Sequence, residues 1–298
     1  MALVGSGALR PPNPPRSFVL VHAHPDDEAL GTGGVMARYS DEGAHVCLVT
    51  CTNGELGEVA EVPELGTVEE ITARLGEIRA DELRESCHRL GDIDIRMLGY
   101  RDSGMEGTDG NRDPRSFVNQ DIDRPIRDVV AILREVRPQV LVTYNDYGFY
   151  GHPDHIRAHE VAIAAVARAT DASFAPELGP VHDVAKVYYM AVAKSFFREG
   201  RDLATQMGIE PDDLFDEETI ETIGTDDDAI TAWVDVSGYV DRKFAALEAH
   251  RTQRGTTERF MSIPAEYRKK AFGMENFVLV SPKTPRVRET DLFEGLSV

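Results

Sequence analysis

The sequence has few cysteines, and their scarcity excludes a disulfide-stabilised fold. Only Cys47, Cys51 and Cys87 occur, an odd number without a Cys-x-x-Cys spacing, which favours a reducing compartment and predicts a cytoplasmic protein. The first two cysteines lie four residues apart in a predicted strand, about 13 Å along an extended chain and too far for a disulfide. The cysteines are therefore expected to fill space in the core.

Basic residues are also scarce. The chain has 32 Lys and Arg against 52 Asp and Glu, a formal net charge of −20, so its surface should repel nucleic-acid backbones and anionic membranes. No stretch approaches the roughly 18 apolar residues of a membrane span. Residues 1–16 contain Arg10 and four prolines but no continuous apolar segment, which predicts a flexible N-terminal arm rather than a signal peptide.

From Ser17 onward, short apolar runs alternate with longer amphipathic segments, as is typical of a mostly parallel sheet flanked by helices. We expect strands at 17–23, 44–51, 94–99, 139–145, 185–193, 229–236 and from 275, and helices at 29–42, 68–91, 121–136, 153–169 and 239–253. A long loop rich in Gly and Asp is expected at 100–117.

The predicted fold class is therefore α/β, with a Rossmann-like sheet and a smaller C-terminal α/β lobe. Residues 17–185 would form the catalytic region that carries both polar motifs described next. Residues 186–298 would complete the substrate pocket within the same single domain.

Two polar clusters follow predicted strands. "HAHPDDE" at residues 22–28 follows the first strand, and "YGHPDH" at residues 150–155 follows the fourth. Ligands of open α/β sheets bind at the carboxyl ends of the strands, so the clusters would meet in space if the two strands are neighbours. Acids crowded at the end of a buried strand are costly unless a proton, a cation or solvent neutralises them.

A bound zinc ion is one explanation of this crowding. His24, Asp27 and His155 can supply the imidazole and carboxylate ligands that zinc binds at about 2.0–2.2 Å. If one coordination position stays open, Asp26 could take a proton from the attacking water. One HPD sequence alone is as typical of a helix-capping turn with an ordinary histidine, but two of them after strands favour a metal site.

Further residues of the second cluster suggest catalytic roles. His152 lies one helical turn before His155 and could donate a proton to a leaving amine, with Asp154 as its orienting partner. The Tyr150 hydroxyl could stabilise an oxyanion, although beside Tyr147 and Phe149 it could equally be a packing aromatic.

Two other classes of site are disfavoured. The chain has no GxSxG sequence, and no cysteine lies beside a histidine-bearing loop, which argues against nucleophilic catalysis. "GTGG" at residues 31–34 lacks the GxGxxG spacing of a dinucleotide site, and HPDDE occupies the turn that pyrophosphate would need.

The pair "AHPDDE" and "GHPDH" resembles the LmbE-like or PIG-L family of zinc-dependent N-acetylglucosaminyl deacetylases. The resemblance covers most of residues 17–294 and is strongest to the branch that contains the mycothiol-pathway GlcNAc-inositol deacetylase and the mycothiol S-conjugate amidase. It implies an LmbE-like fold, a Zn²⁺ cofactor with Fe²⁺ as the alternative, and a small amino-sugar conjugate as partner. A homo-oligomer stays open.

By this resemblance, the metal ligands are His24, Asp27 and His155, and the general base is Asp26. His152 resembles the proton donor or electrostatic stabiliser of the family, and Tyr150 its mobile oxyanion-stabilising tyrosine. The segments "GEIRADEL", "RDSGMEGT" and "LEAHRTQ" resemble those that reach the sugar, which implicates Arg79, Asp102 and Gln253. For Arg79 and Asp102, a surface salt bridge or a loop cap is the competing interpretation.

The predicted function is removal of the N-acetyl group from a GlcNAc-inositol-like conjugate by metal-activated water, which releases acetate and a free amine. Gly31 stands where the S-conjugate amidase pattern has a lysine, which weakens the amidase interpretation. Two alternatives stay open. One is an amidase acting on a mycothiol S-conjugate or a glycosylated natural product, and the other is a non-catalytic metal- or sugar-binding protein.

Overall fold

The computed structural model describes residues 16–206, 216–280 and 288–297 of the chain. The predicted N-terminal arm lies outside these residues except for Arg16, as do part of the acidic stretch before Asp216 and part of the C-terminal tail. None of the described helices is long and apolar enough to cross a membrane.

Within the described residues, seven strands form one sheet in the order β3-β2-β1-β4-β5-β7-β6. Neighbouring strands from β3 to β5 pair in parallel, whereas β7 runs antiparallel to both β5 and β6. The predicted α/β class with a mostly parallel sheet is confirmed. The strands are β1 (Ser17–His22), β2 (His45–Thr52), β3 (Ile93–Tyr100), β4 (Val140–Thr143), β5 (Lys186–Ala191), β6 (Ala232–Asp235) and β7 (Met274–Leu279).

The C-terminal strands β6 and β7 extend the same sheet instead of forming a separate one. The isolated bridge between Ala232 of β6 and Glu289 brings the described part of the C-terminal tail onto this edge. The functional division of the chain near residue 185 stays a prediction.

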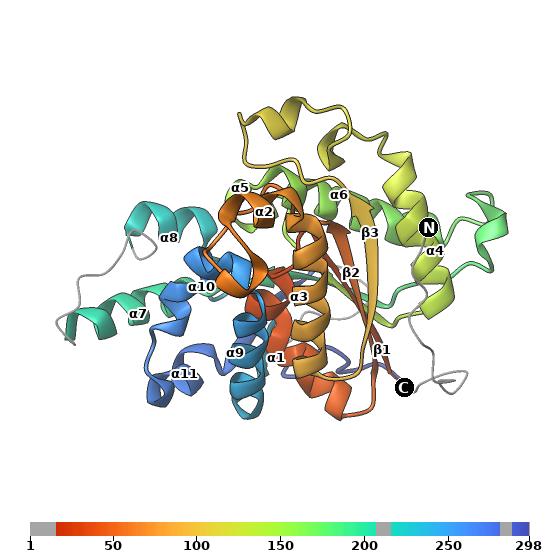
Figure 1. Ribbon diagram of the computed structural model, residues 1–298. Coiled ribbons are helices and arrows are strands. Elements are labelled where there is room, and N and C mark those ends of the chain that lie inside the picture. Colours follow the sequence, from red (N-terminus) through yellow and green to blue (C-terminus); the bar gives the residue numbers. More distant parts are fainter. Residues whose placement is uncertain (1–15, 207–215, 281–287, 298) are drawn as a thin grey trace.

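Helices cover both faces of the sheet (Figure 1). The longer ones are α1 (Asp27–Asp41), α3 (Leu75–Leu90), α4 (Asp123–Val136), α6 (Pro153–Ala169), α7 (Lys194–Gln206) and α9 (Val240–Ala249). The shorter ones are α2 (Val68–Ala73), α5 (Gly148–Gly151), α8 (Glu217–Ile223), α10 (Arg254–Met261) and α11 (Ala265–Phe272).

Strand β1 is buried on both sides because it lies near the middle of the sheet. Phe18 and Leu20 point into the core under α1, α3 and α9, whereas Val19 and Val21 point into the core under α4 and α6. This is the two-residue alternation of a strand, and burial of both faces explains why β1 is a continuous apolar run.

The helix expected over 68–91 is interrupted at Arg74, whose φ of −125° and ψ of 17° are not helical. Thr67 and Glu70 form a capping box that starts α2. The break lets Ile71 of α2 pack with Leu75 and Ile78 of α3 in a small apolar cluster that also contains Val62. Helices α7, α8, α10 and α11 were not expected from the sequence pattern.

The strand order places the two polar motifs side by side. From β1 the chain proceeds through β2 to β3 on one side of the sheet, and from β4 it proceeds to β5 on the other. Strands β1 and β4 are therefore neighbours at the point where the order reverses, which is where open α/β sheets form a crevice at their carboxyl ends. Helix α1 begins directly after β1, and α6 begins at Pro153, shortly after β4.

Candidate active site

The three predicted metal ligands converge at this crevice. His24 Nδ1 lies 3.2 Å from His155 Nε2. The carboxylate of Asp27 faces both rings, with Oδ2 3.6 Å from His24 Nδ1 and Oδ1 3.4 Å from His155 Nε2. Ligand atoms at about 2.0–2.2 Å from a tetrahedral ion stand about 3.3–3.6 Å apart. The His24–His155 spacing is therefore close to that of two ligands on one divalent cation, and each ring has a different oxygen of the Asp27 carboxylate within a similar distance.

Tyr144 holds two of these ligands, and the sequence reasoning missed it. Its hydroxyl donates a 2.7 Å hydrogen bond to Asp27 Oδ2, and its ring stacks on His155 with centroids 4.2 Å apart. The backbone N–H of His24 donates to the same Asp27 oxygen at 2.8 Å. A tyrosine directly after a buried strand, in "VTYN", was the available signal. Such contacts fix ligand orientation and tune metal affinity.

The second nitrogen of His24 faces acids. His24 Nε2 lies 3.2 Å from Asp154 Oδ2 and 3.8 Å from Asp102 Oδ1. Burial lowers the pKa of His24, but hydrogen bonds to Asp154 and Asp27 outweigh it and raise the pKa well above its ordinary value. A proton on Nε2 bound to Asp154 leaves the Nδ1 lone pair for a metal, the arrangement common among histidine ligands.

Asp154 was expected to orient His152. Its backbone N–H does so, donating to His152 Nδ1 at 3.1 Å. Its carboxylate instead binds His24 and accepts the backbone N–H and the hydroxyl of Ser103, at 2.9 and 2.5 Å. The side chain of Asp154 is therefore directed at His24, a predicted metal ligand, and Ser103 is a second residue that the sequence reasoning missed.

Among the described residues, two groups have ligand atoms that all lie close enough together to hold a cation: His24 with His152 and His155, and His24 with Asp102, His152 and Asp154. Both contain His152, and neither contains Asp27. Protonation argues against His152 as a ligand. Burial, together with the neighbouring His24 and His155, lowers the pKa of His152 to about 4, so its ring is neutral at pH 7. Its Nδ1 lone pair accepts the Asp154 N–H, so Nε2 carries the proton and has no lone pair to offer.

Asp26 lies between β1 and α1 in a sparsely populated backbone conformation, with φ 119° and ψ −27°. Its side chain is about one-fifth exposed, and its Oδ2 lies 3.0 Å from Arg79 Nη2. Burial raises the pKa of Asp26 to about 6, against the opposing charge of Arg79 and with the help of Asp27. A carboxylate with this pKa can accept a proton at neutral pH and release it again.

Strain at Asp26 can be measured by comparing two truncations. Asp26→Gly and Asp26→Ala both remove the carboxylate that pairs with Arg79. Neither removes a helix cap, because the Asp26 side chain makes no cap hydrogen bond. Glycine alone tolerates the positive φ without strain. We expect the Gly variant to exceed the Ala variant in free energy of unfolding by about 1 kcal/mol in urea denaturation. Equal stabilities would show an unstrained backbone.

Two of the predicted substrate-binding residues, Arg79 and Gln253, bind other residues of the protein. Buried Arg79 donates from Nη1 to Gly54 O at 2.8 Å and from Nη2 to Pro25 O, besides pairing with Asp26. Gln253 Nε2 donates to Glu58 O at 2.8 Å. A side chain at Gly57 would clash with both Arg79 and Gln253, which explains the glycine there. A sugar contact by either residue stays a prediction.

Asp102 lies closer to the proposed ligands. Its Oδ1 accepts the Gly104 N–H at 2.7 Å and its Oδ2 accepts the Leu56 N–H at 3.3 Å. The first bond lies within the loop after β3, and the second holds that loop against the loop after β2. Because Oδ1 also lies 3.8 Å from His24 Nε2, Asp102 shapes the floor of the site in addition to any contact with a sugar.

Tyr150 lies on the rim. It is 42% exposed, and its ring packs edge-on against His155 with centroids 4.9 Å apart. The residues around it have unusual backbones: Gly148, Phe149 and Gly151 all have positive φ, of 66°, 69° and 86°. Phe149 is the strained member, since it is not glycine. The oxyanion role of Tyr150 stays a prediction.

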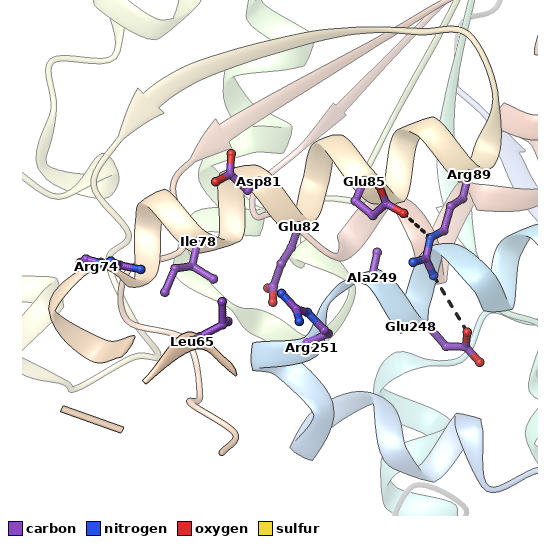
Figure 2. Close-up of a pocket in the computed structure, with 10 residues that line it drawn as sticks. All are labelled: Leu65, Arg74, Ile78, Asp81, Glu82, Glu85, Arg89, Glu248, Ala249 and Arg251. Carbon is purple, nitrogen blue, oxygen red and sulfur yellow. Dashed lines mark hydrogen bonds and ion pairs between the residues drawn. The ribbon is translucent and has the colours of Figure 1, made fainter. Parts of the chain in front are cut away.

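A separate hollow of about 380 Å³ lies between α3 and α9 (Figure 2). None of the motif residues lines it. Arg89 reaches Glu85 at 2.8 Å and Glu248 at 4.0 Å across its mouth, and Glu82 in its wall binds the backbone and hydroxyl of Thr252. These contacts are ion pairs and hydrogen bonds between residues of the protein, and no predicted metal ligand or catalytic residue lines this hollow. The candidate active site therefore lies at the carboxyl ends of β1 and β4.

Comparison with known proteins agrees with the geometry. The family model described as "PIG-L: GlcNAc-PI de-N-acetylase" matches residues 19–166, which include both motifs. The 1D-myo-inositol 2-acetamido-2-deoxy-alpha-D-glucopyranoside deacetylase of Geodermatophilus obscurus is 44% identical over 291 residues, covering 95% of this chain and 99% of the relative.

Solved structures share the fold at lower identity. The N,N'-diacetylchitobiose deacetylase from Pyrococcus horikoshii has a TM-score of 0.58 at 21% identity, covering 89% of this chain and 84% of its own. GalB, the 4-carboxy-2-hydroxymuconate hydratase from Pseudomonas putida KT2440, also has a TM-score of 0.58, at 18% identity, covering 91% and 98%. Because a deacetylase and a hydratase share this architecture, the structures establish the fold alone.

Proposed function

The chain belongs to the PIG-L family of de-N-acetylases, and from this premise we propose that it is a divalent-metal hydrolase that removes the N-acetyl group of a GlcNAc-inositol conjugate. The observation that carries the proposal is the convergence of His24, Asp27 and His155 with Asp26 beside them. The similarity to a GlcNAc-inositol deacetylase over nearly the whole chain supports the substrate. A cytoplasmic location and a role in mycothiol biosynthesis belong to the same proposal.

His24, Asp27 and His155 would hold Zn²⁺ or Fe²⁺, with imidazole and carboxylate donors that suit either ion. When bound, the ion would polarise the acetamide carbonyl and lower the pKa of water toward ~7. Tyr144 and Asp154 keep the ligand side chains oriented. The His155 imidazole is neutral at pH 7, since burial lowers its pKa to about 4, whereas the acids around His24 raise the pKa of that ring, so a metal would have to displace a proton from it.

Asp26 takes a proton from the attacking water as the water oxygen bonds to the carbonyl carbon. Its pKa of about 6 leaves it ionised at pH 7 but able to hold the proton transiently. The C–N bond then breaks, acetate leaves, and the nitrogen takes up a proton to become a free amine. Protonated Asp26 is the acid within reach that can supply this proton.

His152 acts as a neutral hydrogen-bond donor. Because its Nδ1 accepts the Asp154 N–H, its Nε2–H is available to the oxygen that gains negative charge during attack. The lowered pKa of His152 favours this role over that of a cationic acid. Tyr150, on the rim beside His152 and His155, would supply a second donor.

Acetate release from GlcNAc-inositol tests the proposal. We expect the purified chain to contain about one divalent ion, to release acetate and free amine in equal amounts, and to lose this activity on chelation and regain it with zinc. A mycothiol S-conjugate and a glycosylated natural product serve as competing substrates, and faster cleavage of either would assign an amidase. Bound metal with no hydrolysis of any amide would leave a binding protein.

A further inference from the structure

We propose that Glu28, itself fixed by His250 and Ser86, is a positioning residue for Asp26, which rests on the proposed role of Asp26 as general base. Glu28 is the last acid of the crowded "HPDDE" motif, and it takes no part in the steps above. Its Oε2 accepts the backbone N–H of Asp26 at 2.9 Å. This bond fixes the backbone of Asp26, which is strained at its φ of 119°.

The other oxygen of Glu28 is anchored from two directions. Its Oε1 accepts a 2.7 Å bond from His250 Nε2 and a 2.5 Å bond from the Ser86 hydroxyl. All three side chains are completely buried. A carboxylate can accept from three donors at once, so glutamate satisfies Asp26, His250 and Ser86 together.

The anchors come from distant parts of the chain. Ser86 belongs to α3, and His250 follows α9, 222 residues from Glu28. Helices α1, α3 and α9 pack against one another on one face of the sheet (Figure 1). The packing of these helices therefore determines where Glu28 stands, and Glu28 in turn determines the backbone of Asp26.

Arg79 completes the support from the opposite side. Its Nη2 binds both Pro25 O and Asp26 Oδ2, whereas the Asp26 N–H binds Glu28. Arg79 fixes the carboxylate, whereas Glu28 fixes the main chain. Loss of Glu28 should let the Asp26 backbone relax toward an ordinary φ and move its carboxylate away from the water.

Glu275 offers a matched control. It is also buried, it accepts the N–H groups of Gly34 and Val35 in α1 at 2.8 Å, and it pairs with Lys243 of α9 at 2.7 Å. Like Glu28, it is a buried carboxylate that joins α1 to the α9 region through several bonds, but these bonds go to Gly34, Val35 and Lys243 and not to the HPDDE turn. Glu28→Met and Glu275→Met should destabilise the fold to a similar degree.

The experiment compares kcat, KM, bound metal and Tm in Glu28→Met, Glu28→Gln, Glu275→Met and Asp26→Asn. We expect Glu28→Met to lower kcat about 100-fold with KM and metal content unchanged, as for an approximately 1 Å displacement of a catalytic group. Glu275→Met should keep kcat within about 3-fold at a comparable Tm. Glu28→Gln, whose amide oxygen can still accept the Asp26 N–H, should recover most of the loss.

Other outcomes overturn the inference. If Glu28→Met and Glu275→Met lower kcat equally, or if Glu28→Met loses its metal, Glu28 is a structural residue. If Asp26→Asn is inactive while folded Glu28→Met is fully active, the positioning role fails and the proposed function stands. If Asp26→Asn keeps its turnover, Asp26 is not the general base, and the positioning role of Glu28 fails with that assignment.

A crystal structure of a Glu28 variant gives a readout that needs no substrate. Asp26 should leave the positive φ region in Glu28→Met, whereas φ near its present value would contradict the proposal. Should Glu28→Met fail to fold, Ser86→Ala loosens the same carboxylate at lower structural cost. It should lower kcat about 5-fold to 10-fold, and an unchanged kcat and Asp26 backbone in that variant would also overturn the inference.

Discussion

Asp26→Asn is expected to lower kcat by about 10³-fold while the protein keeps its metal. The amide has the size of the carboxylate and an oxygen that can still accept from Arg79, so the turn should stay in place. It cannot accept the proton of the attacking water at neutral pH, because it has no basic oxygen. The measurement is single-turnover acetate release beside metal analysis of the same sample.

A matched variant separates charge from position in this prediction. Arg79→Lys keeps a positive charge near Asp26 but lacks the fork that binds Asp26, Pro25 and Gly54 together. It should retain metal and lose less activity than Asp26→Asn. Full turnover in Asp26→Asn would exclude Asp26 as the base and direct attention to the other carboxylates of the site.

Asp27→Asn is expected to weaken metal binding, whereas His152→Gln is expected to leave it unchanged. Asp27→Asn should lower metal affinity about 100-fold and abolish turnover, because the lost charge is the anionic member of the set with His24 and His155. Tyr144 and the His24 N–H both donate to this carboxylate, so an amide nitrogen turned toward them would also repel a donor.

His152→Gln should keep the metal and lower kcat by about 10-fold to 100-fold, because the flexible glutamine amide does not hold an N–H where the imidazole Nε2–H donates to the developing oxyanion. Competition with a chromophoric chelator measures the affinity of both variants under the same conditions. The reverse result, with metal lost from His152→Gln and retained by Asp27→Asn, would assign the cation to the alternative group of His24, His152 and His155.

The sheet could be predicted to a large extent because its signals are local. Strands β1, β2, β4 and β5 are short and mostly apolar, and α6 spans the predicted residues 153–169. The order of the C-terminal strands could not be predicted, since the antiparallel insertion of β7 between β5 and β6 depends on which edge is free. The break at Arg74 was also missed, because helical periodicity continues through it.

The residues of the candidate site also fall into two groups, those that a local sequence motif identifies and those that only tertiary contacts identify. His24, Asp27 and His155 could be identified as candidates because each follows a strand in a short motif. Tyr144 and Ser103 lie outside these motifs, and Glu28 ends the first one without a role that the motif itself assigns. The importance of all three depends on contacts across 51 to 222 positions of the chain. Only when β4 is placed beside β1 does the Tyr144 hydroxyl meet Asp27.

The amino-acid sequence alone determined the α/β class, the two HPD turns and the types of ligand they offer, because these follow from the order of neighbouring residues. The tertiary structure decided which charges face one another: Arg79 against Asp26, Asp154 against His24, and His250 against Glu28. The reason is physical. An ion pair or hydrogen bond depends on distances of a few ångströms, and for residues on separate strands and helices those distances are set by strand order and helix packing.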